Sequence, residues 1–176
     1  MSKPLLPRHG LNCSINTGIK QYNNSMKTKK ICKFMLYVFT PLVLGAIVGF
    51  LTDPGSYKTF SKPIFSPPGW LFPIVWSILY LLMGIGYYMA KNNGLSKEGD
   101  RYYYIQLILN LLWSFIFFSL KWFFISSVWI VVLLYFVYKM FKSFKETKKV
   151  AGYLQLPYII WLVIALYLAI GVTILN

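Results

Sequence analysis

Long uninterrupted runs of apolar residues alternate with short polar segments along most of the 176-residue chain. Five of these runs approach the length of about 20 residues that a helix needs to cross a bilayer. They are continuous rather than alternating, which argues against a transmembrane β-barrel. We therefore expect an all-α membrane protein built as a five-transmembrane-helix bundle, with spans near residues 34–52, 70–90, 102–120, 122–140 and 153–175.

Composition supports the membrane class, because 57% of the residues are hydrophobic and only 12% are charged, about half the charged fraction of a soluble domain. Residues 1–32 differ, since they are polar and basic and show no apolar periodicity. We expect them to form a disordered extension, with a second plausible start at Met26, and residues 33–176 to form the membrane domain. A signal peptide is the alternative, but the first apolar run is long for a signal core and no small-residue cleavage site follows it.

The basic residues predict the orientation of the chain. With five spans, the segments before the first, between the second and third, and between the fourth and fifth share one side and hold fifteen of the 18 basic residues. The other side holds Lys58, Lys62 and Lys121. Because basic loops are retained in the cytoplasm, we expect a bacterial cell-membrane protein with its N-terminus cytoplasmic and its C-terminus outside. These charges would meet anionic lipid first, so we expect no nucleic-acid partner.

The segment 62–87 carries the clearest candidate chemistry. Phe72, Trp76 and Tyr80 are spaced four apart, which places them on one helix face. Pro68 suits the first turn of the second helix, and Pro73 is tolerated just after it. We expect the proline-rich segment before the helix to form an ordered lid over one end of the bundle, the alternative being a simple linker. Such an aromatic stripe can stack a flat ligand in a dry, uncharged chamber.

Polar residues inside the spans are few. Asn110 is the clearest, with Gln106 and Ser114 one turn away on the same face. A buried amide in hydrocarbon needs a partner, which is either another helix or a ligand. Lys121 alone separates the third and fourth runs, so these helices should be antiparallel neighbours. Cys13 and Cys32 have neither metal-ligand nor redox spacing, so we expect no metal site.

Small residues and proline add two further expectations. Gly45 and Gly49 form a GxxxG pattern, which indicates either association between chains or close packing within one bundle. Pro157 lies about one turn inside the predicted fifth span and should bend that helix. Trp161 and Ala165 follow Pro157 at spacings of four and share its face.

Three blocks of residues together resemble the TspO/MBR family, the tryptophan-rich sensory proteins that include the mitochondrial translocator protein (peripheral-type benzodiazepine receptor). They occur in family order and spacing, and the resemblance covers roughly residues 34–176. The blocks comprise Lys62-Pro63, Pro67-Pro68, Phe72-Pro73, Val75-Trp76, Leu79-Tyr80 and Met83-Gly84, then Gln106-Leu107, Asn110, Trp113 and Phe117-Phe118, and finally Pro157-Tyr158, Trp161 and Ala165. The chain departs from the family pattern at Ser56, where members usually have tryptophan. No lysine or arginine follows Tyr167, so the cholesterol pattern at that helix end is absent.

The resemblance implies a five-helix bundle, often a homodimer, with a pocket under the first loop that is similar to one holding porphyrins and aromatic drug-like molecules. By motif match, Trp76 and Trp161 correspond to tryptophans linked in some bacterial members to light- and oxygen-dependent porphyrin breakdown, which would make them catalytic if this chain degrades porphyrin. The residues expected to bind ligand are Tyr57, Pro67, Pro68, Trp76, Tyr80, Asn110, Ser114, Phe117, Trp161 and Ala165.

We therefore expect an integral membrane receptor or binding protein for porphyrins (tetrapyrroles) and similar flat hydrophobic ligands, with a sensory or tetrapyrrole-handling role. Its partners would be the porphyrin and the lipid bilayer, with no separate cofactor. The single histidine, His9, lies in the extension, which favours a free-base porphyrin over ligated haem. The alternatives are a light- and oxygen-dependent porphyrin-degrading enzyme, a transporter of hydrophobic small molecules, and a purely structural membrane scaffold.

Overall fold

The structure is a computed structural model that describes the backbone of residues 9–52 and 57–176, with side chains from residue 25 onward. The chain divides into two compact units, residues 1–36 and 37–176, which are described separately. Helix α1 spans His9–Leu51, so the described residues of the first unit are helical where the sequence predicted a disordered extension. A helix nucleated in an apolar run propagates readily through residues that contain no proline, and none occurs between His9 and Pro41.

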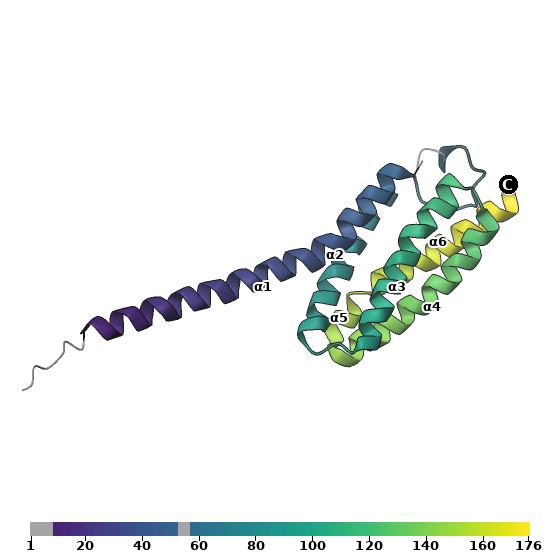
Figure 1. Cartoon of the computed structure of the whole chain (residues 1–176). Helices are drawn as coiled ribbons and strands as arrows, with labels where there is room; N and C mark the ends of the chain where they lie inside the picture. The colour runs from purple at the N-terminus through teal and green to yellow at the C-terminus, as the bar shows by residue number, and fades with distance from the viewer. Residues whose placement is uncertain (1–8, 53–56) are drawn as a thin grey trace, which may run out of the picture. The chain divides into compact units, whose positions relative to one another are not determined.

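The second unit contains the remaining helices (Figure 1). Within the described residues, five helical stretches are long and apolar enough to cross a membrane. This confirms the predicted all-α membrane protein, because a backbone in hydrocarbon must satisfy its polar groups internally. The elements after α1 are α2 (Leu71–Asn92), α3 (Lys97–Ser114), the π-helical turn η2 (Phe115–Ser119), α4 (Phe123–Thr147), α5 (Lys149–Tyr153) and α6 (Leu156–Leu175).

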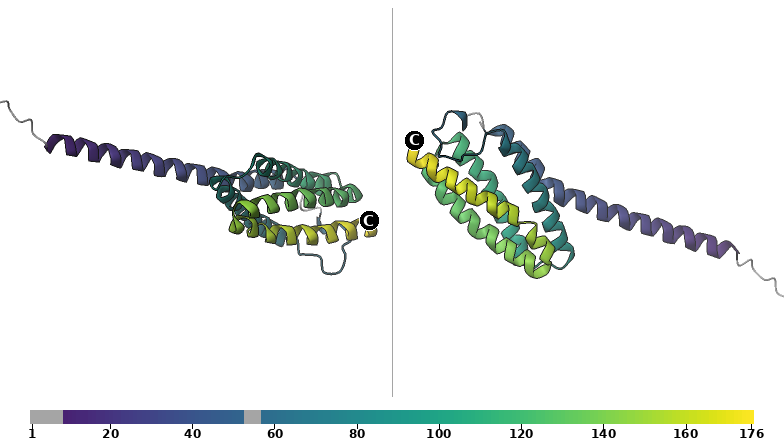
Figure 2. Two further views of the ribbon diagram at one scale, coloured as in Figure 1. Left: turned by 90° about the horizontal axis from the view of Figure 1, so that it is seen from below. Right: turned by 180° about the vertical axis from the view of Figure 1, so that it is seen from behind.

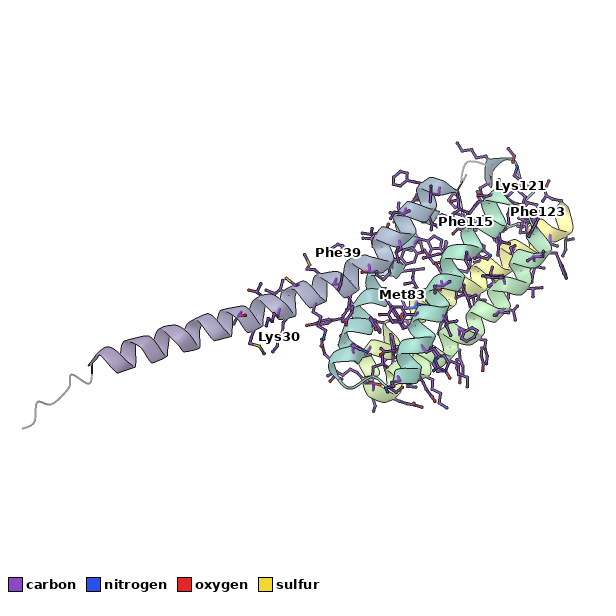
Figure 3. The ribbon with its side chains drawn as sticks, viewed as in Figure 1. Lys30, Phe39, Met83, Phe115, Lys121 and Phe123 are labelled. Carbon is purple, nitrogen blue, oxygen red and sulfur yellow. The ribbon has the colours of Figure 1, made fainter. Side chains whose placement is uncertain are left out.

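Helices α3 and α4 are antiparallel neighbours, as the single residue between the two apolar runs predicted. Lys121 makes the turn with a φ of 56°, a left-handed conformation that is uncommon outside glycine. Figure 3 shows Phe115, Lys121 and Phe123 together at this end of the bundle. The indole nitrogen of Trp129 donates to the backbone oxygen of Leu109 at 2.8 Å and ties the two helices together further along.

The opposite end of the bundle joins α2 to α3 through a short polar turn. Ser96 caps α3 by accepting from the backbone N–H of Gly99 at 3.0 Å, as helix N-caps commonly do. The side chain of Lys91, in the last turn of α2, forms an ion pair with Asp100, in the first turn of α3. Both charges also lie at the helix end whose dipole favours them.

Two expectations about proline were wrong. Pro157 does not lie inside a bent helix, because α5 ends at Tyr153 and α6 begins at Leu156, which places this proline in the first turn of α6. Pro68 precedes α2 and accepts the N–H of Leu71 at 3.0 Å, while Pro73 occupies the first turn of α2 instead. In both places proline lies where its missing N–H leaves no intrahelical hydrogen bond unmade.

Helix α4 contacts both α3 and α6, and Figure 2 shows α4 (green) and α6 (yellow) side by side in both views. Fully buried side chains such as Met83, Ile130 and Val137 fill the space between the helices. At Gly84 of α2, an added Cβ would lie 2.6 Å from the backbone oxygen of Tyr37 in α1. Helices α1 and α2 therefore approach so closely that only glycine fits between them.

Candidate ligand-binding site

A cavity of about 910 Å³ lies between α2, the α1–α2 loop and the part of α1 that belongs to the second unit. This volume is at the upper end of the range of about 300–1,000 Å³ that is usual for small-molecule sites. The lining residues are Leu42, Gly45, Ala46, Gly49, Phe50 and Thr52 of α1 and the residue that follows it, Tyr57, Lys58, Lys62, Ser66, Pro67, Pro68, Gly69 and Trp70 of the loop, Phe72, Pro73, Trp76, Ser77 and Tyr80 of α2, and Ser114 and Phe118.

An aromatic wall forms one side of the cavity. Trp76 stacks on Tyr80 with ring centroids 5.5 Å apart and an interplanar angle of 30°. On another side Trp76 meets the edge of Tyr158 of α6 at 6.1 Å. The spacing of four residues along α2 places the indole and the phenol on one face, as the sequence predicted. The wall thus presents a half-buried indole to the cavity.

A chain of buried hydrogen bonds lies behind this wall. The Tyr80 hydroxyl donates to Asn110 Oδ1 at 2.6 Å, and Asn110 Nδ2 donates to the Tyr158 hydroxyl at 2.9 Å. Tyr158 in turn donates to Gln106 Oε1 at 3.1 Å. Asn110 is 1% exposed and lies outside the cavity lining, so it joins α2, α3 and α6. The structure therefore favours the helix-contact interpretation of Asn110 over the ligand-contact one.

Trp161 does not lie in the same chamber as Trp76. It packs against Phe72 with ring centroids 5.7 Å apart, and Phe72 lines the cavity in its place. Trp161 faces a second, smaller groove of about 580 Å³ that it shares with Pro67 and Tyr167. The expectation that both indoles surround one chamber is corrected accordingly, because Trp161 contacts Phe72 of the cavity lining but is not itself part of that lining.

The other predicted positions divide into two groups. Tyr57, Pro67, Pro68, Tyr80 and Ser114 line the cavity together with Trp76. Phe117 is fully buried and stacks on Trp113 at 5.1 Å, and Ala165 is buried in α6. Neither Phe117 nor Ala165 borders the cavity, so their contact with a ligand stays a prediction.

The described part of the α1–α2 loop, residues 57–70, lines the cavity and bonds to the end of the bundle, which favours the lid over a simple linker; Ser56 lies outside the described residues. The Asn176 side chain accepts from Ser61 N at 3.1 Å and donates to its carbonyl at 2.9 Å. The Tyr167 hydroxyl donates to the Ile64 carbonyl at 2.5 Å. These bonds fasten the loop to the C-terminal half of α6 and to the residue that follows it.

Tyr57 anchors the cavity side of the same loop. Its ring packs against Phe72 at 5.1 Å, and its hydroxyl donates to the Pro67 carbonyl at 2.8 Å. Burial raises the pKa of the Tyr57 phenol, an effect that a hydrogen bond with Ser66 partly opposes. The hydroxyl therefore stays protonated at neutral pH and keeps donating to the loop backbone.

The sequence interpretation missed two features of the site. Lys58 and Lys62 line the cavity, so the chamber is not uncharged. Gly45 and Gly49 also line it, and an added Cβ at Gly45 would collide with the ring of Tyr80. The GxxxG pattern was the signal for the second feature, and Gly45 supports its in-bundle interpretation; association between chains stays a prediction. The sequence could not reveal the position of the two lysines, because a loop has no periodic pattern that shows which side chains face a cavity.

The described lining residues limit the chemistry of the cavity. They include no histidine, cysteine or carboxylate, and their ionisable groups are the lysines and the phenols. This set offers no nucleophile paired with a general base. The arrangement can hold a flat apolar molecule against an indole and present cations beside it.

Comparison with known proteins agrees with the resemblance seen in the sequence. The model of the TspO/MBR family matches residues 37–175. The tryptophan-rich protein TspO of Chlorobaculum tepidum is 37% identical over 155 residues, which cover 84% of this chain and 98% of the relative. The protein CrtK of Rhodobacter capsulatus is 33% identical, covering 81% and 92% of the two chains. The translocator protein of Bos taurus is 30% identical, covering 69% and 78%. Together with the five apolar helices, these matches show that the chain is an integral membrane protein that belongs to the TspO/MBR family.

Proposed function

We propose that the chain is a membrane binding protein for porphyrins and similar flat hydrophobic ligands, with a sensory or tetrapyrrole-handling role. The observation that carries the proposal is the cavity of about 910 Å³ with Trp76 stacked on Tyr80 in its wall. A stacked aromatic pair contributes about 0.5–1.5 kcal/mol beyond the burial of its apolar area. A planar ligand lying on Trp76 would gain this stacking free energy in addition to the free energy of its transfer from lipid or detergent into the cavity.

The lining residues favour a free-base porphyrin over ligated haem. Haem iron is usually held by histidine, cysteine, methionine or tyrosine. Among the described lining residues only the tyrosines belong to this set, and the hydroxyls of Tyr57 and Tyr80 already donate hydrogen bonds to protein acceptors. Binding would therefore rest on stacking and apolar contact.

The names of the relatives are consistent with a role in sensing or handling small molecules. Cereibacter sphaeroides has a relative named tryptophan-rich sensory protein, and bovine and fission-yeast relatives are named translocator protein or its homolog. A sensory protein needs a ligand site more than a catalytic one, and the cavity lining agrees with this because it lacks a nucleophile–base pair.

A titration of the purified protein with protoporphyrin IX in a neutral detergent tests the proposal, with the shift of the porphyrin absorption band as readout. We expect saturable binding that weakens in Trp76→Phe by less than about 12-fold, because a full aromatic stack contributes about 0.5–1.5 kcal/mol and the smaller phenyl ring keeps part of it. Trp161→Phe is the matched control, since this indole is not part of the cavity lining, and its affinity should change little. Absence of saturable binding by the folded wild-type protein would refute the proposal.

One observation favours light-dependent porphyrin breakdown as a second candidate function. Trp76 borders the cavity and stacks on Tyr80, so an electron from the indole could reach a photoexcited porphyrin bound there. Illumination of the porphyrin complex in the presence of oxygen should then form degradation products in the wild type and fewer in Trp76→Phe. Identical products at identical rates in both proteins would exclude a role of this indole in breakdown.

The distribution of charge supports a cell-membrane location with the N-terminus cytoplasmic and the C-terminus outside. A reporter enzyme that works only outside the cytoplasm should be active when it is fused after Asn176. Activity of a cytoplasmic reporter at that position would reverse the orientation. Association into a homodimer belongs to the same proposal.

A further inference from the structure

Two lysines lie at the loop side of the cavity, where the sequence had predicted an uncharged chamber. Lys58 and Lys62 are both exposed residues and both belong to the lining. The Lys62 ammonium donates to the Tyr57 carbonyl at 3.0 Å and lies 4.7 Å from the centroid of the Tyr57 ring. The side chain of Lys62 is therefore folded back against the loop beside the cavity.

Neither ammonium group is neutralised by a described carboxylate. Across residues 25–52 and 57–176, ion pairs join Lys91 to Asp100 and Lys142 to Glu146. An ammonium group has three N–H donors, and the Tyr57 carbonyl accepts from one of those on Lys62. Donors and positive charge thus remain for a negatively charged group in the cavity.

The cavity is also asymmetric in its chemistry. Both lysines and Ser66 come from the loop, which also contributes apolar side chains, whereas the membrane-spanning helices contribute no charged side chain to the lining. A ligand that fits both parts has a flat apolar body and acidic groups on one edge. A porphyrin with carboxylate side chains has this shape, and its ester does not carry the charges.

We propose that Lys58 and Lys62 bind the carboxylates of the ligand and select acidic, amphipathic planar molecules over neutral ones of the same shape. The inference rests on the proposed function and deepens it by naming the ligand class and the groups that recognise it. Hydrogen bonds between charged partners are roughly twice as strong as neutral ones. At the loop side of the cavity they favour the diacid over a neutral analogue.

Paired titrations with protoporphyrin IX and its dimethyl ester test this inference in a neutral detergent. We expect the wild type to bind the diacid about 2- to 30-fold more tightly than the ester, which is the range for two ion pairs made by exposed lysines. In the double variant Lys58→Gln/Lys62→Gln this ratio should fall toward one, through weaker binding of the diacid and unchanged binding of the ester. The two probes partition into the micelles in the same way whichever protein is present. Comparing the affinity ratio of the variant with that of the wild type therefore cancels any difference in this partitioning.

Lys121→Gln is the matched control. Lys121 lies at the same end of the bundle (Figure 3), 6.0 Å from the Phe60 ring, but it is not part of the cavity lining. The ratio of diacid to ester affinity in Lys121→Gln should equal that of the wild type. If Lys121→Gln lowers the ratio as much as the double variant does, the effect is general surface charge and the inference fails.

Failure of the inference is distinguishable from failure of the proposed function. Saturable binding of diacid and ester with equal affinity in the wild type would overturn the role of the two lysines and leave porphyrin binding in place. Absence of saturable binding for both probes would overturn the two proposals together. A wild-type preference for the diacid that survives unchanged in the folded double variant would assign the recognition to other groups and would also overturn the inference.

Discussion

Replacing Asn110 with leucine removes the central link of the hydrogen-bond chain behind the aromatic wall. The amide accepts from the Tyr80 hydroxyl at 2.6 Å and donates to the Tyr158 hydroxyl at 2.9 Å. Leucine has the same branched arrangement of four side-chain heavy atoms, with bulkier methyl groups at its end, and can make neither bond. Tyr80 is then left with a buried donor and no acceptor, while Tyr158 still donates to Gln106.

The magnitude follows from the two lost bonds. Hydrogen bonds between membrane helices are worth about 0.6 kcal/mol each on average. An unsatisfied buried hydroxyl costs about 1–3 kcal/mol. Since the Tyr80 ring is only 6% exposed, its hydroxyl has little access to water. We therefore expect Asn110→Leu to lower the free energy of unfolding by about 1–3 kcal/mol.

Unfolding in mixed micelles, followed by circular dichroism, measures this change. A double-mutant cycle with Tyr80→Phe isolates the orphaned hydroxyl, because Asn110→Leu/Tyr80→Phe removes donor and acceptor together. The double variant should be less destabilised than the sum of the single variants. Ser114→Ala, one turn later on α3 and beside the cavity, is the matched control and should stay close to the wild type.

The same substitution should also alter the cavity wall. Tyr80 carries the stacked Trp76 ring, so releasing its hydroxyl should broaden the Trp76 emission and weaken protoporphyrin IX binding. Full stability together with unchanged emission in Asn110→Leu would refute the reasoning, because it would mean that the amide holds neither the helices nor the wall. Additive effects in the double-mutant cycle would refute the hydrogen bond to Tyr80.

Further predictions concern helix packing. Gly84→Leu should prevent stable folding of the bundle, because an added Cβ would lie 2.6 Å from the Tyr37 carbonyl, and backbone cannot yield as a flexible side chain can; unfolding in micelles indistinguishable from that of the wild type would contradict the close approach. Gly49→Ala is the control for this change, since nothing lies within 4 Å of its added Cβ, and it should unfold like the wild type. Trp129→Phe should cost about 1 kcal/mol in the same assay by deleting the 2.8 Å bond to the Leu109 carbonyl, and an unchanged midpoint would show that this bond does not stabilise the α3–α4 pair.

The helix ends were harder to predict than the helices themselves. The apolar runs suggested spans of 102–120 and 122–140, whereas the helical stretches are Lys97–Ser119 and Phe123–Thr147. Helices extend beyond the hydrocarbon because lysine stems can cover apolar surface while their charges remain in water. Capping by Ser96 fixed the start of α3, and the break at residues 154–155 placed Pro157 at a helix start rather than inside a helix.

The apolar runs and their periodicity predicted the number of membrane-spanning helices, their order and the stripe that includes Trp76 and Tyr80. The physical reason is that a chain in hydrocarbon must close its backbone hydrogen bonds within each segment, so the length and periodicity of the apolar runs are sufficient. Three features emerged only from the packed helices: Trp161 contacts Phe72 and lies outside the cavity lining, Asn110 joins three helices, and the loop brings Lys58 and Lys62 to the cavity. These outcomes depend on the rotation of each helix and the path of one loop, which are fixed by packing between distant segments rather than by any local pattern.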